Sequence, residues 1–154
     1  KLSLDDWNKS IAVNLTGVFL MCQQVGKIMK KQKHGNIINI GSTYGLVAPD
    51  QRIYGDSGQN AAAFYSASKG GVINLSRYLA SYWNRTGIRV NTVTPGGVGN
   101  NQKSNFIKKY SNKTMLGRMA KKDEYVAAIL FLSSDASSYM TGSNLIIDGG
   151  WTAW

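Results

Sequence analysis

The sequence predicts an α/β protein with a parallel sheet of about three strands and helices on both faces. Short apolar runs at about 36–41, 88–93 and 144–148 alternate with helical patterns, an order typical of a parallel sheet. The length of 154 residues suits one domain with a sizeable core. A hydrophobic content of 43% and a charged content of 17% are ordinary for a globular chain.

The first predicted helix covers about 5–33. Ser3 followed by acidic residues is typical of a helix start, and Gly35 is expected as the left-handed residue that ends the helix. The helix is expected to be broken at most once. Cys22 lies among its apolar residues and is expected to be a buried small side chain. The helical spacing is carried by Val13, Leu15, Val18, Phe19, Met21, Val25 and Ile28.

The middle of the chain predicts a strand, a long loop and a second helix. The strand at 36–41 ends at Ser42, and the loop from 44 to 64 contains several glycines and a proline. A helix is expected from about 64 to 85, with Gly87 after its end. The Gly70-Gly71 pair inside this helix predicts close packing of another helix.

The last third predicts a strand at about 88–93 that runs into a Pro-Gly turn. An irregular helical segment to Met119, a helix at about 123–133 and a strand at about 144–148 follow. Asp148-Gly149-Gly150 is expected to turn the chain. Trp151 and Trp154 then either cover a pocket or an interface, or pack in the core.

The candidate chemistry is concentrated in Tyr65-Ser66-Ala67-Ser68-Lys69. A Tyr and a Lys four residues apart stand on the same face of a helix. An ammonium group near a phenol stabilises the phenolate, which makes the pair a general acid or base for an alcohol or carbonyl oxygen. Ser42, at the carboxyl end of a strand, could donate a hydrogen bond to the same oxygen.

Together these motifs, in this order, resemble the short-chain dehydrogenase/reductase family over nearly all 154 residues. The matching segments are Asn14-Leu15-Thr16-Gly17, the strand ending at Ser42, Tyr65 to Gly71, Arg89 to Val98, and Leu145 to Gly150. The resemblance implies a Rossmann-type fold and an NAD(P)-dependent oxidoreductase. It also implies a catalytic set of Asn14, Ser42, Tyr65 and Lys69.

The resemblance further implies which residues contact the cofactor. Tyr65 and Lys69 would lie at the nicotinamide and its ribose, and the backbone of Val98 would hold the carboxamide. Asn100 stands where the family often has Thr, which leaves its own contact open. The implied cofactor residues are therefore Tyr65, Lys69, Pro95, Gly96, Val98 and Asn100.

The Gly-rich turn with which this family binds the pyrophosphate is not found in these residues. The 17 glycines form neither a G-x-G-x-x-G nor a G-x-x-x-G-x-G pattern leading into a helix. Residues 1–154 are therefore expected to form a single unit, the C-terminal catalytic portion of such an enzyme. The choice between NAD and NADP cannot be predicted from them.

The loop between Ser42 and Tyr65 is longer than is typical of the family, and long loops inside compact domains are commonly functional. Its candidate substrate contacts are Tyr44, Gln51, Arg52 and Tyr54, with a surface excursion or an oligomer contact as the alternative. The polar loop and the excess of lysine favour a hydroxylated or anionic substrate such as a sugar or sugar acid. A 3-oxoacyl thioester is the main rival.

The formal net charge of +10 has two explanations, solvated helix faces and steering of an anionic ligand. Binding of nucleic acid is disfavoured because no stacking platform accompanies the lysines. No apolar run reaches the length of a membrane span. A cytoplasmic enzyme is the default expectation. The only histidine, His34, excludes a His-rich metal site, and no metal is expected.

A homo-oligomer, dimer or tetramer, is expected because the edge of strand 36–41 and one helical face would be uncovered. By resemblance, helices 5–33 and 64–86 are those that pair subunits in the family. The alternative function is a non-catalytic dimerisation module derived from the same fold.

Overall fold

The computed structural model describes residues 2–154, and Lys1, the first residue of the predicted unit, lies outside the described residues. Its three strands are β1 (Gly35–Ile40), β2 (Ile88–Pro95) and β3 (Asn144–Ile147). They form one parallel sheet in the order β1-β2-β3, with Ile37 opposite Val90 and Val93 opposite Leu145. The predicted strands are confirmed to within two residues at each end.

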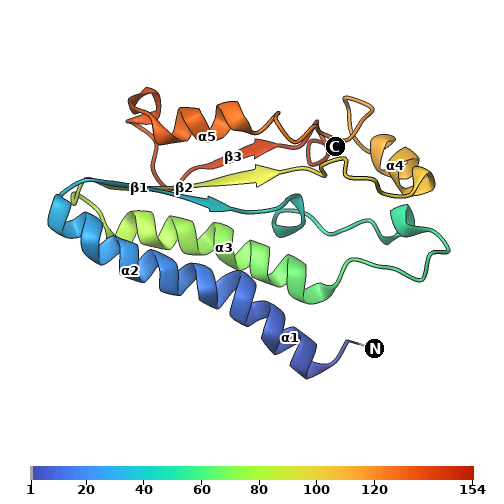
Figure 1. Ribbon diagram of the computed structural model, residues 1–154, viewed down its shortest axis with the longest axis horizontal. Helices are drawn as coiled ribbons and strands as arrows, with labels where there is room; N and C mark the ends of the chain where they lie inside the picture. The colour runs from blue at the N-terminus through green and yellow to red at the C-terminus, as the bar shows by residue number, and fades with distance from the viewer. Residues whose placement is uncertain (1) are drawn as a thin grey trace.

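Helices cover both faces of this sheet, as predicted. Figure 1 shows α2 and α3 on one face and α5 on the other, with α4 beyond the carboxyl ends of the strands. The helices are α1 (Leu4–Ile11), α2 (Gly17–Gln32), α3 (Ala63–Tyr82), α4 (Ser104–Ser111) and α5 (Val126–Ser133). Short helical turns are η1 (Ala12–Thr16), η2 (Thr43–Gly45), η3 (Gln51–Tyr54) and η4 (Asp135–Ser137).

The first helix starts and breaks where the sequence predicts. Ser3 Oγ accepts from the Asp6 N–H at 3.0 Å, while the Asp6 carboxylate accepts from the Ser3 N–H at 3.4 Å. This reciprocal capping box satisfies two N–H groups that the first helical turn cannot. The single break is the π-helical turn η1 between α1 and α2.

The end of α2 differs from the prediction. Lys33, and not Gly35, takes the left-handed conformation, with φ of 55°. The N–H groups of Lys33 and His34 both bond the carbonyl of Met29 and so close the last turn two residues earlier. Gly35 instead begins β1, where a Cβ would lie 2.5 Å from Met29 Sδ. Glycine is required there for close approach and not for a positive φ.

The main core lies between the sheet and the α2–α3 layer. Trp83 fills the space beside Gly26, where a Cβ would come within 2.1 Å of the indole. Cys22 is buried as predicted. Burial of each large apolar side chain contributes about 1.5–3 kcal/mol. The core residues are Cys22, Ile37, Leu79, Trp83, Ile88 and Val90.

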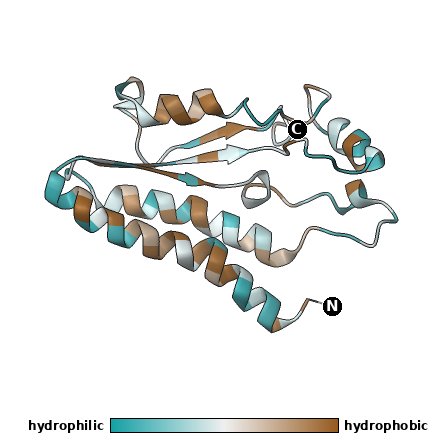
Figure 2. Cartoon of the chain, viewed as in Figure 1, coloured by the Kyte–Doolittle hydropathy of each residue, from teal (hydrophilic) through white to brown (hydrophobic). Residues whose placement is uncertain are grey.

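The opposite face of the α2–α3 layer is apolar and exposed, and β1 is an edge strand. Figure 2 shows the hydrophobic residues along α2. The prediction of an uncovered edge and helical face is confirmed for this chain. The helical stretch Leu4–Gln32 is long and apolar enough to span a membrane by length and composition alone, which is weak evidence. The exposed residues include Val13, Phe19, Met21, Ile28, Tyr78 and Tyr82.

Candidate active site

Ser42 lies just beyond the carboxyl end of β1 and is buried. Its backbone stays extended, with φ of −162° and ψ of 152°, and its Oγ accepts from the Tyr44 N–H at 3.2 Å. This bond caps η2. Gly41, before it, packs where a Cβ would lie 2.7 Å from Thr94 Oγ1. The hydroxyl is therefore held at the edge of the sheet where parallel strands end.

The turn η2 packs directly on the backbone of α3. At Gly45 a Cβ would lie 2.7 Å from the carbonyl carbon of Lys69, so a larger residue would push the two elements apart. Tyr44 lies edge-on to Tyr65, with ring centroids 6.5 Å apart. This packing brings Ser42 to the same region as the first turns of α3.

Tyr65 and Lys69 lie on one face of α3, as the spacing predicts. Lys69 Nζ is 5.9 Å from the centroid of the Tyr65 ring and donates to the Ile40 carbonyl at 2.9 Å. Partial burial of this ammonium lowers the pKa of Lys69, since desolvation disfavours the charged form. The lysine is thus a positioned cation whose charge is incompletely compensated by its neighbours.

Asn14 lies in the π-helical turn η1 and reaches α3 through Ser68. Its Nδ2 donates to Ser68 Oγ at 3.4 Å, and this hydroxyl donates to the Tyr65 carbonyl at 2.9 Å. The turn also packs closely at Gly71, where a Cβ would lie 2.8 Å from Leu15 Cδ2. The close helix packing that the Gly70-Gly71 pair predicts is confirmed at Gly71. Such π turns are frequent at functional sites.

A cavity of about 270 Å³ opens between η2, α3 and the turn after β2. Seven residues expected at the site line it, among them Ser42 and Tyr65. This cavity is called the catalytic cavity below. Its full lining is Ser42, Thr43, Tyr44, Tyr54, Tyr65, Pro95, Gly96, Gly97, Val98, Gln102, Phe106, Tyr110 and Met119.

Neither Asn14 nor Lys69 lines the catalytic cavity, and three further expected contacts, Gln51, Arg52 and Asn100, also lie outside its wall. The Gln51 amide bonds both the N–H and the carbonyl of Ala61 and so clamps the two ends of the long loop. Arg52 forms a fork with Asp50, and its side chain is 86% exposed. Asn100 donates its backbone N–H to Gln102 Oε1 at 2.6 Å. The structure therefore gives these residues local structural contacts, whereas Tyr44 and Tyr54 stand in the cavity wall.

Sequence reasoning missed four wall residues from the segment after Val98: Gln102, Phe106, Tyr110 and Met119. The Tyr110 hydroxyl accepts from the Gly97 N–H, and its ring stacks on buried Trp151 at 4.2 Å. Trp151 therefore packs in a core and does not cover a pocket or an interface, which were the alternatives for this residue. Burial raises the pKa of Tyr110 to about 12. The sequence does not place these residues at the site, because Gln102 and Met119 lie outside regular elements and the position of α4, which carries Phe106 and Tyr110, depends on tertiary contacts.

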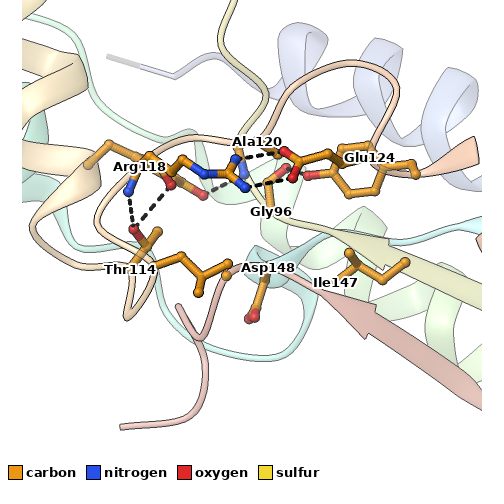
Figure 3. A pocket seen from close by; sticks show the side chains of 12 residues that line it. Gly96, Thr114, Arg118, Ala120, Glu124, Ile147 and Asp148 are labelled. Atoms are coloured by element: carbon orange, nitrogen blue, oxygen red, sulfur yellow. Dashed lines mark hydrogen bonds and ion pairs between the residues drawn. The ribbon is translucent and has the colours of Figure 1, made fainter.

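A second, smaller cavity of about 140 Å³ lies beside the turn from Pro95 to Val98 and is lined by Gly96 and Gly97 (Figure 3). Arg118 and Glu124 form a two-bond ion pair across it at 2.7 and 2.6 Å. Tyr125 donates to the Gly96 carbonyl at 3.2 Å. This pairing and the Lys121 N–H lower the pKa of Glu124 to about 2. The polar side chains around this smaller cavity bond one another and the Gly96 carbonyl, so they support the turn.

A larger cavity of about 540 Å³ shares Tyr54, Gln102 and Phe106 with the catalytic cavity. It is called the outer cavity below. The long loop supplies one wall and the segment leading into α4 supplies the other. Its remaining lining is polar: Asp56, Ser57, Gln59, Asn101, Lys103 and Asn105. Among residues 2–154, no group of three His, Cys, Asp or Glu side chains could hold a metal ion.

Comparison with known proteins agrees with this geometry. A family model described as enoyl-(acyl carrier protein) reductase matches residues 1–152. The chain belongs to the short-chain dehydrogenase/reductase family. Its structure superposes on a short-chain dehydrogenase of Leptospira borgpetersenii with bound NAD+, with a TM-score of 0.93 and 42% identity. That match covers 99% of this chain and 58% of the other.

Curated members of this short-chain dehydrogenase/reductase family include enzymes with different substrates. The chain is 40% identical over 160 residues to D-threitol dehydrogenase of Mycolicibacterium smegmatis, covering 99% of this chain and 56% of that protein. It is 39% identical over 154 residues to 3-oxoacyl-[acyl-carrier-protein] reductase of Thermotoga maritima, covering 97% and 58%. The chain thus spans a little over half the length of these relatives.

Proposed function

We propose that the protein is an NAD(P)-dependent oxidoreductase that transfers hydride between a nicotinamide and an alcohol or carbonyl substrate. The observation that carries this proposal is the convergence of Ser42, Tyr65 and Lys69 beside one cavity on a scaffold of the dehydrogenase family. The catalytic set proposed is Asn14, Ser42, Tyr65 and Lys69.

The donor set fits the nicotinamide end of such a cofactor. Lys69 and Tyr65 would hold the ribose hydroxyls, the backbone of Pro95, Gly96 and Val98 would line the ring, and Val98 would hold the carboxamide. When bound, NAD(P) supplies or accepts the hydride. Asn100 offers its backbone N–H to Gln102, so we assign it to the shape of the turn.

The chain's own residues handle the proton. Tyr65 would give a proton to the substrate oxygen or take one from it, and the Lys69 ammonium would stabilise the phenolate state. Ser42 would hold the same oxygen and share its developing negative charge. Asn14, held by Ser68, would position water between Lys69 and solvent. Burial of Tyr44 raises the pKa of that phenol strongly, which keeps it a neutral wall residue.

We also propose that the pyrophosphate is held by residues outside these 154. Two observations support this: the sequence has no Gly-rich pattern leading into a helix, and the chain spans 56% of D-threitol dehydrogenase. On this proposal the 154 residues form the catalytic portion of the enzyme. NAD or NADP stays undecided.

For the substrate we propose a polyol or a related hydroxylated acid. The outer cavity offers the amides of Gln59, Asn101 and Asn105, the hydroxyl of Ser57 and the ammonium of Lys103, which suit hydroxyls better than an acyl chain. A relative of 40% identity is named a D-threitol dehydrogenase. A 3-oxoacyl thioester is the second candidate, because another relative is named for that reaction.

Titration with NADH and with NADPH tests the cofactor proposal, using this chain and the protein at its natural length. We expect saturable binding by the natural-length protein, weakened at least about tenfold by Lys69→Ala, since hydrogen bonds to a charged group are lost. Lys31→Ala, an exposed lysine at the far end of α2, is the matched control. Absence of binding by the natural-length protein would refute the proposal and favour the non-catalytic module.

Initial rates with four- to six-carbon polyols and with a 3-oxoacyl thioester distinguish the substrates. We expect oxidation of polyols, and a preference for the thioester would overturn the polyol assignment.

We further propose that the exposed face of α2 and α3 pairs subunits in a homo-oligomer, dimer or tetramer. Sedimentation of a monomer at micromolar concentration would contradict this. Cytoplasmic location stays a prediction.

A further inference from the structure

Gln102 is bound to the backbone of the turn that it follows. Its Nε2 donates to the Val98 carbonyl at 2.8 Å, and its Oε1 accepts from the Asn100 N–H at 2.6 Å. One primary amide thus closes the segment from 98 to 102 on itself. Neither bond is predictable from the sequence, because both depend on the path of an irregular turn.

The segment that Gln102 closes is strained on one side and anchored on the other. Asn101 lies in the left-handed region, with φ of 55°, which non-glycine residues adopt only at some energetic cost. The anchored side is a short parallel bridge, in which Gly99 and Ala120 donate to the carbonyls of Ala120 and Gly97 at 2.9 and 3.0 Å. Loss of the Gln102 bonds would therefore free the strained part and leave the anchor intact.

The position of Gln102 links the two cavities. Its side chain lines the catalytic cavity together with Val98, and it lines the outer cavity together with Asn101 and Lys103. Rotation of this side chain away from Val98 would therefore carry its amide toward the outer cavity. There an amide offers one acceptor and two donors to substrate hydroxyls.

We propose that the Gln102 amide is a latch that occupies the Val98 carbonyl until a cofactor carboxamide replaces it, and that the released amide then binds substrate in the outer cavity. This inference rests on the proposed function, which assigns the Val98 backbone to the carboxamide. Both groups are primary amides and both donate to a carbonyl. Gln102 is thus a positioning residue that makes the substrate site complete only after the cofactor is bound.

Cofactor binding to a Gln102→Met variant tests the latch. Methionine keeps the unbranched shape and removes both hydrogen bonds. We expect the Kd for NADH, measured by nicotinamide fluorescence without substrate, to fall about three- to tenfold because one or two competing hydrogen bonds are gone. The KM for polyol should rise about tenfold, because methionine cannot make the hydrogen bonds to substrate that the released amide would make. Gln32→Met, at an exposed glutamine at the end of α2 that lines neither cavity, is the control and should leave the NADH affinity unchanged.

A carbonyl oxygen has two lone pairs and can accept two donors. If Val98 accepts both amides at once, Gln102→Met will leave the NADH affinity equal or weaker, and that result overturns the latch. Polyol KM unchanged in Gln102→Met would overturn the second half of the proposal.

Amide hydrogen exchange at Asn100, followed by NMR, separates failure of the latch from failure of the proposed function. We expect slow exchange in the cofactor-free protein and fast exchange in Gln102→Met, and faster exchange when NADH is added to the wild-type protein. If the wild-type protein binds neither NADH nor NADPH, the proposed function and the latch both fail. Slow exchange at Asn100 in the wild-type protein and fast exchange in Gln102→Met would still show the hydrogen bond between the Asn100 N–H and Gln102. Slow exchange at Asn100 in both the wild-type protein and Gln102→Met would show that Gln102 does not protect this N–H, and that result overturns the latch.

Discussion

The two ends of strand β2 are built in opposite ways. At its amino end, Arg89 and Asn91 bond the carbonyl and amide groups of the segment from 132 to 143. At its carboxyl end, the backbone of Gly96 and Val98 faces two cavities. The amino end is therefore closed by bonds to a neighbouring segment, whereas the carboxyl end borders the cavity in which we propose that the cofactor binds.

This difference shows how a small scaffold can hold an open site. Asn91 and Val90 are wholly buried, and Gly142 donates to the Val90 carbonyl at 2.7 Å. The closed end thus fixes the direction of β2 and the register of its neighbours. With that direction fixed, the turn at Pro95 lines the same cavity as Ser42 and Tyr65. The comparison predicts that mutations at the open end reduce activity and that mutations at the closed end reduce stability.

The largest effect is expected at the open end, from Tyr65→Phe. Removal of the hydroxyl removes the proposed proton donor and should lower kcat about 10²- to 10⁴-fold. The free energy of unfolding should change little, because the ring and its contact with Tyr44 remain. Steady-state rates and urea unfolding measure the two quantities. Tyr139→Phe, at a fully exposed tyrosine, is the control, and a variant that kept wild-type activity would exclude Tyr65 as the acid or base.

The next effect is expected at the closed end, from Asn91→Ala. Asn91 Nδ2 donates to the Met140 carbonyl at 2.9 Å, and its Oδ1 accepts from the Ser143 N–H at 3.0 Å. Substitution leaves a cavity and an unsatisfied N–H, so the free energy of unfolding should fall by about 3 kcal/mol. Asn60→Ala, at an exposed residue of the long loop, should change it by no more than about 0.5 kcal/mol. Equal effects of the two substitutions would contradict the closed-end account.

A smaller loss of stability is expected from Arg89→Met. The guanidinium donates to the carbonyls of Leu132, Ser134, Ser137 and Met140 at 3.0–3.3 Å, where α5 ends. A cation is favourable at a helix carboxyl terminus, and methionine retains much of the apolar stem. Urea unfolding should show a loss of about 2 kcal/mol. Arg85→Met, at an exposed arginine beyond the end of α3, is the control, and no difference between the two variants would mean that solvent replaces these bonds.

The sequence was informative where function requires a fixed spacing. Tyr65 and Lys69 share a helix face in any α-helix, and Ser42 follows an apolar strand whose end is evident from the residues themselves. Seven of the residues expected at the site therefore line the catalytic cavity. The capping box at Ser3 was also predictable, because its two partners are three residues apart.

The remainder depends on tertiary structure. Gln102 enters the site through an irregular turn that is bonded to Ala120, and Tyr110 enters it from α4, where its ring stacks on Trp151 far along the chain. Lys33 takes the left-handed conformation although a glycine is two residues away, because Gly35 is needed beside Met29. In both cases the packing of a residue against a neighbouring element, and not its own local preference, decides its position.

The smallest effect concerns the ion pair that supports the open end. Arg118 and the Lys121 N–H hold the pKa of Glu124 at about 2, below its ordinary value of 4.5. A carboxyl group with a lowered folded-state pKa stabilises the fold above pH 4.5, and this contribution is lost as the pH falls toward 2. Glu124→Gln should therefore reduce the loss of stability between pH 6 and pH 3, measured by urea unfolding at each pH.

The expected change in Glu124→Gln is slight, because the pair is largely exposed and salt weakens it. Asp50, whose pKa is lowered by Arg52 and Lys113, retains part of the acid sensitivity in the variant. Asp123→Asn is the control, since the described residues give Asp123 no ion pair. An equal pH dependence in wild type and Glu124→Gln would show that this pair contributes nothing to the fold. In that case the Pro95 to Val98 turn would be held by Tyr110, Tyr125, Gln102 and its backbone bonds to Ala120 and Ile147.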